Sequence, residues 1–209
     1  MNITLIFLLG LIIAFVGVIP PGLLNMTAAK ISLKEDSSRG ILFSIGVCVI
    51  VCVQTSVAAI FAKYLQNHPD VIDILQRVAL VIFILITIYY FILAQKQPKP
   101  NIEANIKSKH HRFFQGMLLS SLNVFPIPYQ AYMTITLAGF GWMSFERSSI
   151  TAYVAGAAMG TFIMLYIYIF FFDKIKNKKF TSQKSMNYFI GSITGMIAIF
   201  TLINIIKEL

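Results

Sequence analysis

The stretch VIPPGLLNMTAAK, Val18–Lys30, places two adjacent prolines and a glycine inside a long apolar segment. Proline has no backbone N–H, and its ring clashes with the carbonyl group four residues earlier. Pro20 and Pro21 therefore predict a broken helix in which the carbonyl groups of Val16 and Gly17 lose their partners. In hydrocarbon an unsatisfied backbone group costs several kcal/mol, so such a break must face protein or a water-filled cavity.

The composition predicts an all-α, polytopic membrane protein. Of 209 residues, 57% are hydrophobic and 12% are charged, whereas soluble domains average about 45–50% and about 25%. The apolar residues fall into six segments of roughly 20 residues or more, the length a helix needs to cross a bilayer. These six predicted transmembrane helices are Thr4–Ala29, Gly40–Tyr64, Val71–Leu93, Phe113–Phe140, Ser149–Phe172 and Met186–Ile206.

The basic residues predict the orientation in the membrane. Thirteen Lys and Arg residues lie in or beside the loops on one side of the six segments, and four lie on the other. Cytoplasmic loops carry the excess of positive charge, so both termini are expected on the periplasmic side. The same reasoning explains the net charge of +9 without a nucleic-acid partner.

A basic linker, residues 95–112, divides the chain into two three-helix halves, 1–94 and 113–209. Because three is odd, the second half enters the membrane from the opposite face, which is the geometry of an inverted repeat. The fourth segment also contains two prolines, Pro126 and Pro128, which would free the carbonyl groups of Leu122 and Val124. We therefore expect two inverted repeats whose first helices, the first and fourth of the chain, are both broken by prolines.

Two such breaks could form a solute site near the membrane midplane. A half-helix N-terminus favours an anion and a C-terminus favours a cation, so the pair suits an amino acid zwitterion. The predicted binding residues are Pro20, Pro21, Gly22, Asn25, Thr27, Gln54, Asn123, Pro126, Pro128, Tyr129 and Gln130. The alternative is a pair of proline kinks without a ligand, in which the amides and hydroxyls only join helices.

These residues resemble a known family. The first half combines the Pro-Gly element with SSRGILFSIGVCV (37–49), and the second contains HHRFFQGMLLSSLNVFPIPYQAYMTI (110–135). Together they resemble the lysine exporter (LysE/RhtB) family of bacterial amino acid exporters. Two departures leave the solute open: the family motif Pro-Gly-Pro reads Pro20-Pro21-Gly22 here, and Pro126 follows Phe125 rather than Asn.

The resemblance implies a secondary transporter of the bacterial inner membrane. It would export amino acids or similar small metabolites by alternating access, driven by the proton gradient. Its partners would be the solute and the lipid bilayer. No cofactor, metal site or enzymatic activity is expected, and association into a homo-oligomer is left open.

Two other functions were weighed against transport. Cys48 and Cys52 lie four residues apart in one apolar segment, which is compatible with a membrane thiol–disulfide carrier. The absence of cysteine from the second half argues against that carrier, since such chemistry would use one cysteine from each repeat. A non-transporting scaffold would leave the paired proline positions without an explanation.

Overall fold

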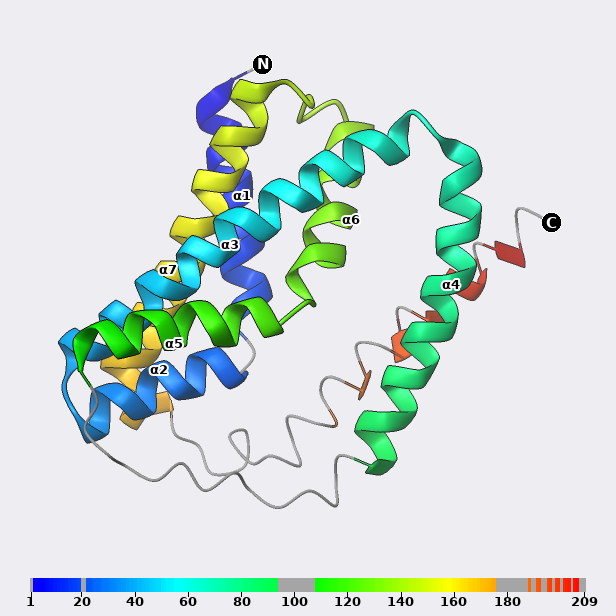
Figure 1. Cartoon of the computed structure of the whole chain (residues 1–209). Coiled ribbons are helices and arrows are strands. Elements are labelled where there is room, and N and C mark those ends of the chain that lie inside the picture. Colours follow the sequence, from blue (N-terminus) through cyan, green and yellow to red (C-terminus); the bar gives the residue numbers. More distant parts are fainter. Residues whose placement is uncertain are drawn as a thin grey trace. The chain divides into compact units, whose positions relative to one another are not determined.

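The computed structural model describes residues 2–19, 22–93 and 108–175, together with scattered positions between 188 and 206. Throughout this part of the chain the regular elements are helices (Figure 1). The chain forms two compact units, one of residues 1–66 and 104–175, the other of residues 67–103 and 176–209.

The first apolar segment forms two helices rather than one. Helix α1, Ile3–Val18, begins after Asn2, whose side chain accepts a hydrogen bond from the Thr4 N–H. Helix α2, Leu23–Lys34, begins after Gly22, and its axis lies at 79° to that of α1. Pro20 and Pro21 lie outside the described residues.

Four more helices complete the first unit (Figure 1). Helix α3 covers Ser37–Gln66. Helix α5, Lys109–Leu122, and helix α6, Pro126–Gly139, replace the single fourth segment of the sequence analysis. Helix α7 covers Arg147–Ile175. Because proline suits the first helical position, where its missing N–H is not needed, Pro126 begins α6 at a position that the sequence favours.

Glycines let two pairs of helices approach closely. Helix α1 packs on α7, and a methyl group at Gly10 or Gly156 would overlap the carbonyl oxygen of Tyr153 or Phe7. Helix α3 packs on α5 in the same way, with Gly46 against Phe113 and Gly116 against Phe43. Small residues permit such approach in membrane helices, where van der Waals packing drives association.

The two crossings use the same spacing in both halves of the chain. In each of the four helices, the glycine at the crossing follows three residues after an aromatic residue. Phe7 and Gly10 thus correspond to Phe113 and Gly116, and Phe43 and Gly46 correspond to Tyr153 and Gly156.

The second unit contains helix α4, Pro69–Ile88, followed by a π-helical turn, Tyr89–Leu93. Within this unit the Phe91 ring lies 5.7 Å from the Tyr188 ring, and Gly191 faces the Phe91 side chain. Of the sixth predicted helix, Met186–Ile206, the structure describes scattered positions, and each of these is helical.

Two helices in the described part, α3 and α7, are long and apolar enough to cross a membrane. The bent pair of α1 and α2 provides a third candidate span when it is counted as one.

Candidate functional site

The two helix breaks lie next to each other in the first unit. Tyr129, in the first turn of α6, donates a hydrogen bond of 3.0 Å from its hydroxyl to the Ile13 carbonyl oxygen of α1. Its ring lies against Gly17, where an added Cβ would come within 2.9 Å of the ring. The Phe125 ring stacks on the Tyr129 ring, with the two ring centroids 6.3 Å apart. The end of α1 and the beginning of α6 are therefore in contact.

Side chains satisfy the carbonyl groups at the end of α1. The Asn25 amide of α2 donates to the Val18 oxygen at 2.6 Å, and the Tyr168 hydroxyl of α7 donates to the Ile19 oxygen at 2.8 Å. Both donors come from helices that pack against the break, and Asn25 is buried. The Val16 oxygen, which was predicted to lose its partner, accepts from the Ile19 N–H at 3.2 Å instead. The carbonyl groups of Val16, Val18 and Ile19 thus find partners within the protein, as a break in a membrane requires.

At the end of α5, Gln54 donates hydrogen bonds to backbone carbonyl groups in the same way. Its amide nitrogen donates to the Ser120 oxygen at 3.0 Å and to the Asn123 oxygen at 2.8 Å. Because only the NH2 group of an amide can donate, these two bonds fix which way the amide points. The Gln54 Oε1 atom is then buried, with no hydrogen-bond donor among the described residues.

The beginnings of α2 and α6 differ in their proline content. Helix α6 has prolines at 126 and 128, and the N–H groups of Ile127 and Tyr129 already bond to the carbonyls of Val124 and Phe125. Helix α2 begins at Gly22 with extended backbone, no side-chain cap and no proline within its first turn. The α2 N-terminus is therefore the better anion site of the two.

The other predicted residues occupy two environments. Gln130 is buried in α6, and its Oε1 accepts a hydrogen bond of 2.6 Å from the Tyr153 hydroxyl of α7. Thr27 is also buried, whereas Pro126 is half-buried and Pro128 is exposed. Asn123 ends α5 and contributes its backbone carbonyl, the one bound by Gln54.

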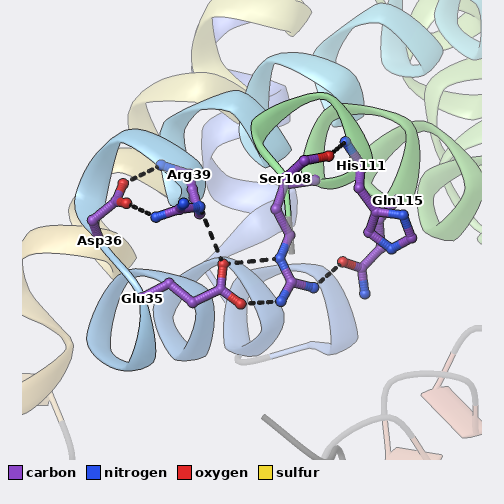
Figure 2. A network of polar contacts seen from close by, with 7 residues as sticks. Glu35, Asp36, Arg39, Ser108, His111 and Gln115 are labelled. Atoms are coloured by element: carbon purple, nitrogen blue, oxygen red, sulfur yellow. Dashed lines mark hydrogen bonds and ion pairs between the residues drawn. The ribbon is translucent and has the colours of Figure 1, made fainter. Parts of the chain in front are cut away.

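A buried ion pair joins the two halves at the opposite ends of α2 and α5 (Figures 1 and 2). Arg112, in the first turn of α5, binds both carboxylate oxygens of Glu35, which ends α2. The two side chains are only 8% and 4% exposed. Arg112 also donates to Gln115, and Arg39 lies 3.7 Å from Glu35.

Asp36 forms the exposed edge of this network (Figure 2). The backbone N–H of Arg39, at 2.8 Å, and the nearby Arg39 guanidinium lower the pKa of the Asp36 carboxyl. A carboxyl whose pKa falls on folding stabilises the fold above its ordinary pKa, and this contribution is lost as the pH falls through the lowered value.

Four of these residues were not predicted from the sequence. Tyr153 and Tyr168 fall inside an apolar segment, where the sequence pattern does not distinguish a hydrogen-bonding tyrosine from the apolar aromatic residues around it. Glu35 and Arg112 lie in polar stretches 77 residues apart, and Arg112 was counted only toward the orientation. The position of Glu35 beside a short loop of one half, facing a basic linker, is the only signal that the sequence offers for this pair.

Comparison with family models matches residues 15–205 to the LysE type translocator family. Comparisons with curated proteins and with solved structures each found no match. Members of this family are transporters rather than enzymes, and the apolar helices α3 and α7 agree with a position in the membrane. The matched region covers the described helices from the end of α1 onward, including both breaks. The chain therefore belongs to the LysE type translocator family and is a multi-pass membrane transporter.

Proposed function

We propose that the protein exports amino acids or similar small metabolites across the bacterial inner membrane by alternating access, driven by the proton gradient. The solute binds where the break between α1 and α2 meets the break between α5 and α6. The supporting observation is the contact of Tyr129 with Ile13 and Gly17, which brings the two breaks together.

The polarity of the two breaks suits a zwitterion. The first turn of α2 has no side-chain cap and no proline, and a helix N-terminus favours a carboxylate. The end of α5 is a helix C-terminus, and beside it the Gln54 Oε1 atom is a buried acceptor without a donor among the described residues, which favours an ammonium group. A neutral site with one pole of each kind would bind an amino acid without a fixed charge from the protein.

The matching glycine crossings support the two inverted repeats on which alternating access would depend. The α1–α7 crossing becomes the α5–α3 crossing when the two halves are exchanged. Repeats related in this way allow one half to rock against the other around a fixed site.

The Glu35–Arg112 pair supports a closed state on one side. It joins the first half to the second at the ends of α2 and α5 that lie away from the breaks (Figure 1). The distribution of basic residues predicts that this side faces the cytoplasm. In this proposal, the pair holds the cytoplasmic ends of the two halves together.

Efflux from loaded cells tests the proposal. Cells that carry or lack the protein are loaded with a panel of amino acids and dipeptides, and the loss of each solute is followed over time. We expect faster loss of at least one amino acid when the protein is present. Equal loss of every solute would reject amino acid export.

A cysteine-free variant separates transport from thiol chemistry. Cys48 and Cys52 both lie on α3 as free thiols, so export by the proposed site does not require them. The double variant Cys48→Ser, Cys52→Ser should keep the efflux of the wild-type protein. Complete loss of activity in a folded double variant would favour the thiol–disulfide carrier instead.

A further inference from the structure

Gln54 carries a buried oxygen atom that the helix contacts leave without a donor among the described residues. Gln54 is 6% exposed and lies in the middle of α3, where it reaches the end of α5. Its NH2 group is fully used by two carbonyl oxygens, and its Oε1 atom has no donor among the described residues. A buried polar atom without a partner is uncommon in native proteins and calls for an explanation.

The surroundings of this oxygen make it a strong acceptor. Both bonds that the amide donates run to carbonyl groups at a helix C-terminus, the negative end of the helix dipole. Hydrogen bonds in such a chain polarise one another, which increases the negative charge on the free oxygen. Neither α3 nor α5 carries an Asp or Glu residue that could supply a full negative charge.

We infer that Gln54 Oε1, at the end of α5, binds a small cation, either by accepting from an N–H of an alkylammonium group or as an oxygen ligand of a metal ion. This assigns Gln54 as the residue that selects for a cationic group. The inference rests on the proposed function in one respect, the origin of the cation. The cation is either the ammonium group of the solute or an inorganic coupling ion.

The neighbouring residue strengthens the assignment. Thr55 is fully buried, and its hydroxyl likewise has no partner among the described residues. In a helix a threonine hydroxyl usually donates to a carbonyl group one turn earlier, as Ser56 does to Cys52 and Thr87 does to Phe83. Two adjacent residues near the middle of α3 thus each carry a buried polar atom without a partner among the described residues.

Thermal unfolding of the purified protein with three chloride salts tests the inference directly. Tetramethylammonium has a positive charge but no N–H donor and serves as the reference at constant ionic strength. Replacing it with ethylammonium should raise the melting temperature by about 3 °C at ten times the dissociation constant. A rise with sodium instead would support the same acceptor site and assign the cation as a coupling ion.

Two variants connect the effect to Gln54. In Gln54→Lys the ammonium group can still donate to the Ser120 and Asn123 carbonyls, but the acceptor is replaced by a positive charge. Gln54→Met has a similar length and neither donor nor acceptor, and it serves if the lysine variant does not fold. Both variants should lose the cation-dependent rise.

The outcomes also separate this inference from the proposed function. Equal melting temperatures of the wild-type protein in all three salts, or an equal rise in wild type and variants, would overturn the role of Gln54. If amino acids fail to leave loaded cells while the cation-dependent rise is present and Gln54-dependent, the proposed export is wrong and the cation site stands.

Discussion

At the scale of single residues, the polar side chains of the apolar helices bind backbone groups. Asn25, Gln54, Tyr129 and Tyr168 each donate to a carbonyl oxygen near the end of α1 or α5. The sequence predicts that such residues gather at the breaks, because proline frees carbonyl groups there. It cannot predict which side chain reaches which carbonyl, since the partners come from other helices, up to 149 residues away.

Removing one hydroxyl should measure how much a hydrogen bond from a side chain to a backbone carbonyl contributes to the stability of the protein. In Tyr168→Phe the Ile19 carbonyl oxygen loses its donor, while the ring and its packing remain. We expect the variant to lose about 1 kcal/mol of stability, seen as a lower melting temperature in detergent. Tyr166→Phe, an exposed position on the same helix, is the matched control. Equal melting temperatures for the two variants would show that the hydrogen bond contributes nothing.

The glycines at the crossings make a second residue-scale prediction. A methyl group in Gly116→Ala would overlap the Phe43 carbonyl oxygen of α3, so the helices must move apart. Overpacking of this kind typically costs about 1–3 kcal/mol, and the melting temperature or the folded yield reports it. Gly139→Ala places a methyl group where nothing lies within 4 Å and should be tolerated. A Gly116→Ala protein as stable as Gly139→Ala would disprove the close crossing.

At the scale of helices, α2 and α5 differ at their two ends. One pair of ends carries the breaks, and the other is joined by the buried Glu35–Arg112 pair. From the sequence, both residues are predicted to lie in polar connections, and the fourth segment is predicted to begin at Phe113. The structure extends that helix back to Lys109, with Ser108 accepting from the His111 N–H as its cap. This extension brings Arg112 into a helical turn facing Glu35.

Breaking the ion pair should be costly, and removing it entirely should not. Glu35→Leu leaves a buried guanidinium without its carboxylate, which typically costs about 3–5 kcal/mol. In the double variant Glu35→Leu, Arg112→Leu, both charges are absent and most of the stability should return. Thermal melting of the three proteins measures this coupling. Lys34→Leu, an exposed position in the last turn of α2 outside this network, is the control and should change stability little. Additive losses in the double variant would contradict a coupled pair.

At the scale of the whole molecule, composition alone predicts the helical class, because a bilayer admits helices whose backbone groups are satisfied within each segment. The resemblance to the lysine exporter family is confirmed by the match over residues 15–205. The six spans and the repeat remain predictions, since two helices, or three with the bent pair counted once, qualify as spans in the described part. Length and hydropathy cannot show how a broken segment lies in the membrane.

Labelling of single cysteines should show the orientation. In a protein without Cys48 and Cys52, His110→Cys and Ser148→Cys place thiols at two exposed positions, in the first turn of α5 and at the beginning of α7. The excess of basic residues predicts that position 110 faces the cytoplasm and position 148 the periplasm. A membrane-impermeant maleimide added to intact cells should label only position 148. Labelling of position 110 alone would reverse the topology.

The most direct test of the central claim is efflux by variants at the place where the breaks meet. Gln130→Glu keeps the acceptor for the Tyr153 hydroxyl but changes the charge at the site, so it should fold and export at least tenfold more slowly. Asn25→Ser, with a shorter polar side chain in the α2 first turn, should likewise slow export. Thr151→Ser, exposed at the start of α7, should export at the wild-type rate. Wild-type efflux from folded Asn25 and Gln130 variants would place the solute path elsewhere and contradict the account.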